Sequence, residues 1–457
     1  MKIKRIISEG LAHISYLLIS ERDACVIDPR RDAKVYLQKA YKEEVNLKYI
    51  FETHRNEDYV IGSMELADII DIEIFHGPGL DWKYGTTLKD NQEFELGSLK
   101  IKAIHTPGHT DESTSFAVYQ PDIGTDTILI FTGDTLFIGD TGRIDMYGPH
   151  QEKRLAENLY HSLFDKILPL GDQAIILPAH GAGSVCGAAI SNREYSTIGL
   201  EKSQNPALQY TKKEDFINFK LTENHYYIPY FQKMEKLNLE GPPLLRNVKR
   251  FKPLEPEEFR LAQNNGAVVL DTREPSSFGG AHIPGSYNIW LEGLPSYAGW
   301  VIPYENPLLL VVRDFKNLNK VHRYLLRLGY DNIMGYLTGG LKAWYSQNYP
   351  IDSLGLITAK QLKNFLDQDS DIYLLDVRSL TEREEGYIKN SKHIYFGYLP
   401  DRLNEIPNDK LIITYCGNGS RASLAASILK KAGFDRVSNF LGSMIAWLNA
   451  GYPIITN

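Results

Sequence analysis

Over roughly the first 235 residues, short apolar runs alternate with polar turns, which predicts β-strands with helices between them. Strands are predicted at 1–7, 23–29, 47–52, 101–104, 127–131 and 174–177, and a helix over about 32–44 with Asp32 as its N-cap. The last four strands run into loops that carry histidine or aspartate, and functional residues often collect in such loops. We therefore expect these polar side chains to converge at one edge of a sheet.

Beyond about residue 245 the pattern repeats itself. The run 268–273 corresponds to 373–378, with Asp271 and Asp376 lying 105 residues apart, and Trp344 and Trp447 lie 103 residues apart. Both copies close on Tyr-Pro. A period near one hundred residues predicts tandem domains rather than a solenoid. Each copy alternates strands and helices, which favours a parallel sheet covered on both faces.

Composition and charge narrow the class of protein. A chain of 457 residues is too long for one hydrophobic core and suggests three domains. The net charge of -7 argues against a nucleic-acid-binding surface. We find no signal peptide and no apolar run long enough to span a membrane. The three cysteines, Cys25, Cys186 and Cys416, lie far apart and fit a reducing cytoplasm.

The loops after the four strands contain sequences typical of a metal centre. They read Thr-His-Arg-Asn-Glu-Asp-Tyr at 53–59, His-Thr-Pro-Gly-His-Thr at 105–110, Thr-Gly-Asp-Thr at 132–135 and Pro-Ala-His-Gly at 178–181. This order and spacing resemble the metallo-β-lactamase superfamily, whose first motif usually reads His-x-His-x-Asp-His. The resemblance implies an αββα sandwich with the site at a sheet edge. Asn56 and Tyr59 stand where two of the motif's histidines would be.

The motif ligands that are present in this sequence decide which kind of metal site can form. A binuclear zinc hydrolase needs the full ligand set, because two cations must be held around one nucleophilic water. A mononuclear iron oxygenase needs two histidines and one carboxylate, which leave positions open for substrate and dioxygen. His54, His109 and Asp134 match the three positions that persulfide dioxygenases of this superfamily use for iron. The resemblance therefore implies one Fe(II) per chain, with zinc as the alternative metal.

The two altered positions bear on a second metal ion. Asn56 is a weak neutral donor in place of an imidazole, and Tyr59 would ligate a metal only as a phenolate. Asp58 and His180 have thereby lost the partners that would hold a second ion. We expect them either as a residual second-metal pair or as hydrogen-bonding partners that orient the iron ligands, the role that the resemblance implies.

Two residues near these motifs have open roles. Arg143, in the glycine-containing loop 139–145, either belongs to a solvated turn or pairs with a substrate carboxylate or with Asp145. Cys186 follows His180 within Ala-Gly-Ser-Val-Cys-Gly, a segment that resembles bacterial fusions of persulfide dioxygenase to rhodanese. It is a candidate sulfur acceptor near the metal, and burial as a small apolar residue is the alternative. Cys25 lies in an apolar strand and is expected in the core.

A second candidate site begins at Cys416, directly after the apolar strand 411–415. A short loop leads from Cys416 to Arg421, and a helix is predicted over 424–432. The loop residues are Gly417, Asn418, Gly419 and Ser420. The glycines allow successive N–H groups to point inward as an anion-binding nest, which together with Arg421 favours a thiolate. Such a thiolate accepts a sulfane sulfur as a persulfide and passes it on.

This loop, the Asp-x-Arg strand ends, Ala-His-Ile-Pro-Gly at 281–285 and the closing Ala-Trp segments resemble the rhodanese fold. In the earlier copy the corresponding segment, Leu308–Lys316, has neither cysteine nor glycine. Without a nucleophile this copy is expected to be an interdomain scaffold, and its aromatic segment 296–300 is a candidate packing surface.

We therefore expect an α/β chain with a metallo-β-lactamase αββα sandwich followed by two tandem rhodanese-like domains. The expected bounds are 1–240, then 250–352 for the copy that lacks the cysteine and 356–457 for the active copy. The resemblance implies iron-dependent oxidation of a low-molecular-weight thiol persulfide to sulfite, coupled to rhodanese sulfur transfer, in sulfide detoxification. The alternatives are a zinc hydrolase resembling the hydroxyacylglutathione hydrolases and a sulfur-relay protein with an inactive metal domain. The expected partners are small molecules (thiol persulfide, thiosulfate or sulfite), neither nucleic acid nor membrane, and homo-oligomerisation stays open.

Overall fold

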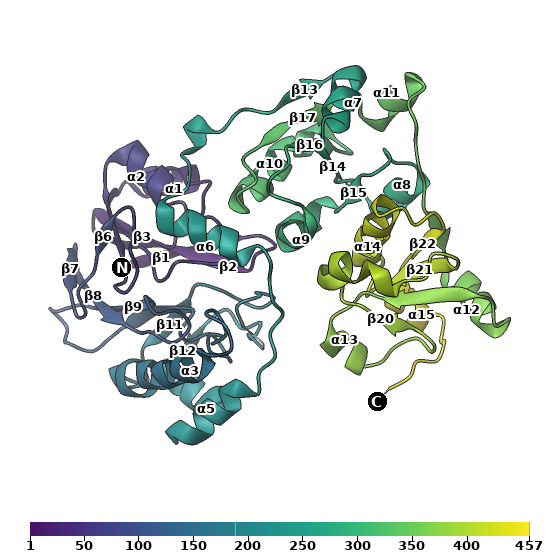
Figure 1. Ribbon diagram of the computed structural model, residues 1–457. Coiled ribbons are helices and arrows are strands. Elements are labelled where there is room, and N and C mark those ends of the chain that lie inside the picture. Colours follow the sequence, from purple (N-terminus) through teal and green to yellow (C-terminus); the bar gives the residue numbers. More distant parts are fainter. Residues whose placement is uncertain (188, 457) are drawn as a thin grey trace. The chain divides into compact units, whose positions relative to one another are not determined.

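The computed structural model describes residues 1–187 and 189–456, which form two compact units (Figure 1). The first unit comprises Met1–Asn247 with the short segment Leu326–Gly329. The second comprises the remaining described residues from Val248 onward.

The first unit contains two six-stranded sheets, and in the first of them the strands lie in sequence order. They are β1 Lys2–Ser8, β2 His13–Ser20, β3 Asp23–Ile27, β4 Asn46–Phe51, β5 Glu73–His76 and β6 Thr86–Thr87. Strands β1 to β3 are antiparallel, whereas β3 to β6 are parallel. Helices α1 (Lys34–Glu43) and α2 (Ser63–Ile70) provide the crossovers that β3, β4 and β5 require as parallel neighbours.

The second sheet has the order β12-β11-β10-β9-β8-β7. Its strands are β7 Glu93–Leu96, β8 Leu99–His105, β9 Thr114–Tyr119, β10 Leu129–Gly133, β11 Ile175–Pro178 and β12 Ser196–Thr197. Only β10 and β11 pair in parallel. The helical elements of this part are α3 Glu152–His161, η1 Ser162–Ile167, η2 Leu168–Leu170, α4 Ile198–Gln204, η3 Ala207–Gln209, α5 Lys213–Leu221, α6 Phe231–Glu240 and η4 Leu245–Asn247.

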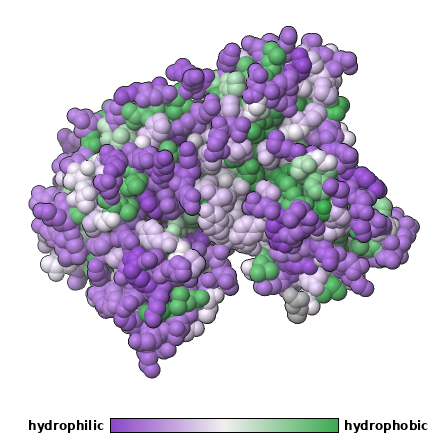
Figure 2. Space-filling view, in the orientation of Figure 1, coloured by the Kyte–Doolittle hydropathy of each residue, from purple (hydrophilic) through white to green (hydrophobic). Residues whose placement is uncertain are grey.

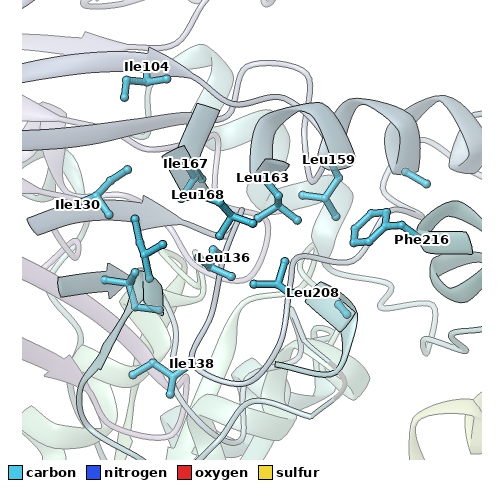
Figure 3. Packing of buried hydrophobic residues seen from close by; sticks show 14 of the residues in the cluster. Ile104, Ile130, Leu136, Ile138, Leu159, Leu163, Ile167, Leu168, Leu208 and Phe216 are labelled. Carbon is cyan, nitrogen blue, oxygen red and sulfur yellow. The ribbon is translucent and has the colours of Figure 1, made fainter. Parts of the chain in front are cut away.

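Three apolar layers give this unit its αββα order. Between the sheets, aromatic rings from both sheets meet, and the centroids of Phe51 and Phe116 lie 4.8 Å apart. Helices α1 and α2 cover the outer face of the first sheet. On the outer face of the second sheet, Leu159, Leu163 and Phe216 gather with Ile130 in one buried cluster (Figure 3). Burial of apolar surface on both faces of each sheet thus holds the layers together.

The predicted strands of this unit are present within two residues of their expected bounds, because their apolar periodicity is strong. The N-cap prediction is wrong. Helix α1 begins at Lys34 with Ala33 at the N-cap position and no side-chain cap. The carboxylate of Asp32 instead accepts from Nε and Nη2 of Arg327 at 2.8 and 3.0 Å, and it lies 3.1 Å from Nε of Arg30.

The second unit contains two five-stranded parallel sheets with matching orders, β13-β17-β16-β14-β15 and β18-β22-β21-β19-β20. The strands are β13 Lys252–Leu254, β14 Val268–Asp271, β15 Tyr287–Asn288, β16 Leu308–Val311, β17 Ile333–Leu337, β18 Gly355–Ile357, β19 Ile372–Asp376, β20 Lys392–His393, β21 Leu411–Tyr415 and β22 Val437–Phe440. The helices are α7 Pro256–Asn264, α8 Pro275–Gly280, η5 Leu291–Gly293, α9 Leu294–Val301, η6 Phe315–Asn317, α10 Leu318–Arg327, α11 Gly340–Ser346, α12 Ala359–Asp367, α13 Leu380–Glu384, η7 Phe396–Glu405, α14 Ser420–Lys431 and α15 Ser443–Asn449.

The two copies of the sequence repeat also share a hydrogen bond between a tryptophan and a proline. The indole N–H of Trp344 donates to the carbonyl of Pro350 at 2.8 Å, and that of Trp447 donates to the carbonyl of Pro453 at 2.9 Å. Each indole therefore ties the closing Tyr-Pro segment of its copy to the helix that precedes it.

The two copies pack together inside the second unit. The hydroxyl of Ser423 in α14 donates to Oδ1 of Asn288 at 2.6 Å. The rings of Tyr297 and Trp300 in α9 lie 5.1 and 5.8 Å from the ring of Phe396 in η7. The aromatic segment 296–300 thus packs on the later copy, as the sequence suggested.

Hydrophilic residues predominate on the face of the molecule that Figure 2 shows, and hydrophobic residues form small areas between them. None of the helices in the described part of the chain has the length and apolar character needed to cross a bilayer.

Replacing Asn288 tests the contact between the copies. Asn288 is buried, and its Nδ2 also donates to the carbonyls of Asp271 and Arg273 at 3.1 and 3.0 Å. Asn288→Ala is expected to lower the free energy of unfolding of the second unit by about 1–3 kcal/mol, because it leaves buried polar groups unpaired. Urea unfolding followed by tryptophan fluorescence measures this, since four of the five tryptophans lie in that unit.

Asn306→Ala is the matched control, because the Nδ2 of Asn306 donates to the carbonyl of Gly266 at 3.0 Å in an exposed position. Equal losses of stability in the two variants would show that the buried hydrogen bonds of Asn288 contribute no more than the exposed one of Asn306.

Candidate metal centre and thiol site

Loops at the ends of β4, β8 and β10 bring ionisable side chains of the first unit together. His54 and Glu57 follow β4, His109 follows β8 and Asp134 follows β10. One ligand atom from each of these four residues lies within 4.8 Å of the others, and all four residues are buried. The structure thus brings together the three candidate iron ligands and adds Glu57. We call these four residues the ligand group.

The side chains of the ligand group face one another closely. The Nε2 atoms of His54 and His109 each lie 3.7 Å from Oδ2 of Asp134. Glu57 closes the group, with Oε1 2.8 Å from Nε2 of His109 and Oε2 3.7 Å from Nε2 of His54. Nε2 of His54 is buried and has no hydrogen-bond partner among the described residues.

Thr53 fixes the orientation of His54. The Thr53 hydroxyl donates to Oδ2 of Asp28 at 2.8 Å. Since a hydroxyl has one hydrogen, its oxygen accepts from Nδ1 of His54, which lies 2.9 Å away. The lone pair of the neutral imidazole is then on Nε2, on the side of Glu57 and Asp134.

His109 is held from the loop that follows Asp134. Its Nδ1 donates to the carbonyl of Arg143 at 2.9 Å, which turns Nε2 toward Glu57. A Cβ atom on Gly142 would lie 2.1 Å from the Asp134 carbonyl oxygen, so this close approach requires glycine. Burial by itself lowers the pKa of His109, but the Glu57 carboxylate outweighs burial and raises this pKa to about 9.

His180, at the end of β11, lies between two carboxylates. Its Nδ1 is 2.7 Å from Oδ1 of Asp134, and its Nε2 is 3.1 Å from Oδ2 of Asp58. Burial lowers the pKa of His180, but Asp134 and Asp58 outweigh burial and raise it well above its ordinary value. Both ring nitrogens therefore donate, and the imidazolium orients Asp134 within the ligand group.

A second set of candidate ligands lies beside the first. Asp58, His180 and Cys186 offer ligand atoms within 4.8 Å of one another. Cys186, in the loop after β11, thus lies beside Asp58 and His180 as a third candidate donor. Burial, followed by Asp58 and Glu57, raises the pKa of the Cys186 thiol well above its ordinary value.

Asn56 and Tyr59 shape the loop and lie outside both sets of ligands. Asn56 has a φ of 42°, a left-handed conformation that asparagine tolerates, and its Nδ2 donates to the His54 carbonyl at 3.0 Å. Tyr59 is buried and stacks on His13 with ring centroids 3.9 Å apart. Burial raises the pKa of Tyr59 well above its ordinary value, so the side chain is a neutral phenol here.

Arg143 pairs with Asp145, which was one of its expected roles. Its guanidinium donates to both carboxylate oxygens of Asp145 at 2.6 Å. It also donates to the carbonyls of Val185 and Tyr226 at 3.0 and 3.1 Å. The guanidinium thus holds the loop before Cys186 in place, and it is committed to partners other than a substrate carboxylate.

The ligand group fits one divalent cation. The buried Nε2 of His54 is left without a hydrogen bond, and two carboxylates lie 3.7 Å from it. A buried polar atom of this kind needs a partner. Imidazole and carboxylate donors suit Fe(II) and Zn(II) alike, so the donors by themselves leave the metal open.

At the second candidate site, the loop after Cys416 is tied by its carbonyls to the start of α15. The N–H groups of Met444 and Ile445 donate to the carbonyls of Cys416 and Gly417 at 3.1 and 3.0 Å. The N–H of Gly419 points the other way and donates to Sγ of Cys416 at 3.1 Å. Such a donor stabilises a thiolate.

Side chains of the loop form further hydrogen bonds and an ion pair. Oδ1 of Asn418 accepts from the N–H of Ser420 at 3.1 Å. Arg421 lies in the first turn of α14, which begins at Ser420 instead of at 424, and donates twice to the carboxylate of Glu382 at 2.6 Å. Burial raises the pKa of Glu382, but Arg421 outweighs burial and lowers it to about 2.

In the earlier copy, Val312 stands at the position of Cys416. Asp271 pairs with Val311 and Asp376 pairs with Tyr415, so the residues that follow these partners, Val312 and Cys416, are equivalent. A valine side chain has no nucleophilic atom, so the first copy has no residue at this position that forms a persulfide.

Three residues of these sites escaped the sequence reasoning. Glu57 is an acidic residue inside the first motif, and this location could have identified it as a candidate ligand. Asp28 directly follows β3, at a strand end like the other site residues. Glu382 had no local signal, because its partner Arg421 lies 39 residues away.

Comparison with known families decides the domain types. The model of the metallo-beta-lactamase superfamily matches residues 10–180, and the model of the rhodanese-like domain matches 255–347 and 358–450. The chain belongs to the metallo-beta-lactamase superfamily and carries two rhodanese-like domains. This confirms the expected fold class of an αββα sandwich followed by two tandem rhodanese-like domains.

The proteins that this chain resembles catalyse different reactions. Hydroxyacylglutathione hydrolase GloC of Haemophilus influenzae is 30% identical over 210 residues, which cover 41% of this chain and 88% of that protein. The mitochondrial persulfide dioxygenase ETHE1 of Bos taurus is 27% identical over 231 residues, which cover 48% and 74%. The crystal structure of a metallo-beta-lactamase from Staphylococcus aureus subsp. aureus COL has 29% identity and a TM-score of 0.65, and the match covers 74% of this chain and 98% of that one.

The contact between Thr53 and His54 is testable by substitution. Thr53→Val removes the hydroxyl that accepts from Nδ1 of His54 and is expected to weaken the binding of a divalent metal by about 10- to 100-fold, as loss of an outer hydrogen-bonding partner does. Competition with a chelator measures the affinity. Thr53→Ser keeps the hydroxyl and should bind metal like the wild type. Equal affinity in all three proteins would show that Thr53 does not orient the ligand.

Proposed function

We propose that this protein oxidises a low-molecular-weight thiol persulfide to sulfite at an iron centre and transfers sulfane sulfur at Cys416. The role would be sulfide detoxification in a reducing cytoplasm. The observation that carries the proposal is the ligand group, in which His54, His109 and Asp134 converge on one position. The similarity to a persulfide dioxygenase supports it.

In this proposal His54, His109 and Asp134 hold the iron, which when bound supplies the redox chemistry with dioxygen that side chains lack. Thr53 and the Arg143 carbonyl keep the two imidazoles turned toward the centre. His180 uses both ring nitrogens on Asp134 and Asp58, which supports a centre with one ion. All of these side chains are buried, so bulk water is kept away from a reactive substrate.

Cys416 carries the second reaction. Its thiolate attacks the outer sulfur of a persulfide, the S–S bond breaks, and the carrier thiol leaves as a thiolate while Cys416 keeps the sulfur as its own persulfide. Sulfite then attacks this outer sulfur, which releases thiosulfate and returns the Cys416 thiolate. The N–H of Gly419 donates to Sγ, and the nearby guanidinium of Arg421 adds positive charge.

A zinc hydrolase is the second candidate. Asp58, His180 and Cys186 offer three donors for a second ion beside the ligand group. The similarity to a hydroxyacylglutathione hydrolase favours the same reaction. This reading requires two ions around one water.

Metal content and oxygen uptake separate the two candidates. Anaerobically purified protein is expected to hold one Fe per chain and to consume oxygen when a small-thiol persulfide is added. His109→Ala should abolish both, because it removes one of the two imidazole ligands. His105→Ala, in the same segment, is the control, since the Nε2 of His105 contacts the Asp111 carbonyl at 2.8 Å instead of the ligand group. Two tightly held Zn ions per chain with thioester hydrolysis would establish the hydrolase instead.

Cys416→Ser tests the sulfur-transfer site. A serine hydroxyl stays protonated where a thiol ionises, so transfer of sulfur from thiosulfate is expected to disappear. Iron content should be unchanged, because the two sites lie in different compact units. Cys186→Ser serves as the comparison and should retain this transfer. The assignment fails if Cys416→Ser transfers sulfur at the wild-type rate and Cys186→Ser does not.

A further inference from the structure

Glu57 is the member of the ligand group that the proposed function leaves unused. Its side chain is 2% exposed, and its ion-pair partners within 4 Å among the described residues are His54 and His109. A buried carboxylate needs positive charge or hydrogen-bond donors close by. An imidazole that gives its Nε2 lone pair to a metal has no proton on that atom to donate to Glu57. With metal bound, the ion would therefore replace the protonated imidazole as the positive charge closest to Glu57.

The loop is built to turn Glu57 inward. Asn56 lies between His54 and Glu57 and has a left-handed backbone conformation, with a φ of 42°. The buried Asn238 in α6 clamps the same loop, since its Nδ2 lies 3.0, 2.6 and 2.8 Å from the carbonyl oxygens of Arg55, Asn56 and Tyr59. Asn56, which replaces a histidine of the motif, thus supports the loop conformation in which the Glu57 carboxylate faces the ligand group.

Glu57 and Asp134 stand in the same relation to His54, because an oxygen of each lies 3.7 Å from its Nε2 atom. We propose that Glu57 is a fourth protein ligand of the metal, so that two imidazoles and two carboxylates hold the ion. This inference rests on the metal site of the proposed function. Two carboxylates would balance the charge of a divalent ion, and a set of two imidazoles and two carboxylates suits Fe(II) and Zn(II) alike.

A fourth protein ligand would change the number of coordination positions that are open to substrate and dioxygen. An ion that takes six ligands would keep two positions for exchangeable ligands if four side chains held it, whereas two histidines and one carboxylate would leave three. Oε1 of Glu57 also lies 3.6 Å from Sγ of Cys186. If Glu57 binds the metal, its carboxylate would link the Cys186 thiol to the ion.

Cobalt(II) binding to the full-length protein tests the ligand role. Glu57→Gln and Glu57→Ala are expected to lower Co(II) affinity by more than about 100-fold, beyond the about 10- to 100-fold loss typical of an outer partner. They should also shift the ligand-field absorption bands of bound Co(II), which a purely electrostatic role would leave in place. Glu52→Gln is the matched control, because the buried Glu52 bonds the Tyr84 hydroxyl at 3.0 Å and lies outside the ligand group. It should bind Co(II) like the wild type.

A crystal structure of the cobalt-loaded wild type decides the matter even if a variant fails to fold. It should show a Glu57 oxygen within about 2.0–2.2 Å of the ion, the range of carboxylate–metal bonds. Wild type that binds Co(II) with Glu57 out of reach, and variants with unchanged bands, would overturn this inference and leave the proposed metal site intact. Wild type that binds no Co(II) at His54, His109 and Asp134 would overturn both.

Discussion

The pairing of buried charges is the constraint on which the metal centre depends. Removing an isolated ion from water costs several kcal/mol, and a partner must compensate for that cost. In the first domain each buried carboxylate of the centre therefore faces an imidazole. The residues are Glu57, Asp58 and Asp134 on one side and His54, His109 and His180 on the other. Among the buried atoms of these six side chains, Nε2 of His54 and Oδ1 of Asp58 have no hydrogen-bond partner in the described part of the chain.

The αββα sandwich makes this pairing possible. Its apolar layers fix the strands, and the ends of β4, β8, β10 and β11 then deliver the charged loops to one region. The loops themselves are held by polar clamps that act on backbone carbonyls. Asn238 binds the loop after β4, and Arg143 binds the loop before Cys186. These contacts involve backbone carbonyls, so they leave the side chains of the ligand group free to face one another.

The second unit uses one fold twice with different results. Both sheets have the same strand order, and both copies close on a tryptophan that binds a proline carbonyl. The copies differ where β16 and β21 end, at Val312 in one and Cys416 in the other. The two copies therefore share a fold but differ at this position, which is an apolar valine in one copy and a thiol in the other, so the fold alone does not decide function.

The sequence by itself determined the strands of the first domain, the repeat in the second unit and the identity of most candidate ligands. These features are local, since they rest on hydrophobic periodicity and on residues a few positions apart. His54, His109 and Asp134 belong to short motifs of this kind. The N-cap prediction for α1 failed because the Asp32 carboxylate pairs with Arg327, 295 residues away, as well as with Arg30.

Only the tertiary structure decided the partners of these residues. Glu57 joins His109, whose ring lies 52 positions away in the chain, and Cys186 joins Asp58 from across the domain. Arg421 likewise meets Glu382, and Asn238 clamps a loop near residue 56. Contacts between distant segments depend on how sheets and loops pack in three dimensions, and no periodicity in the chain records them.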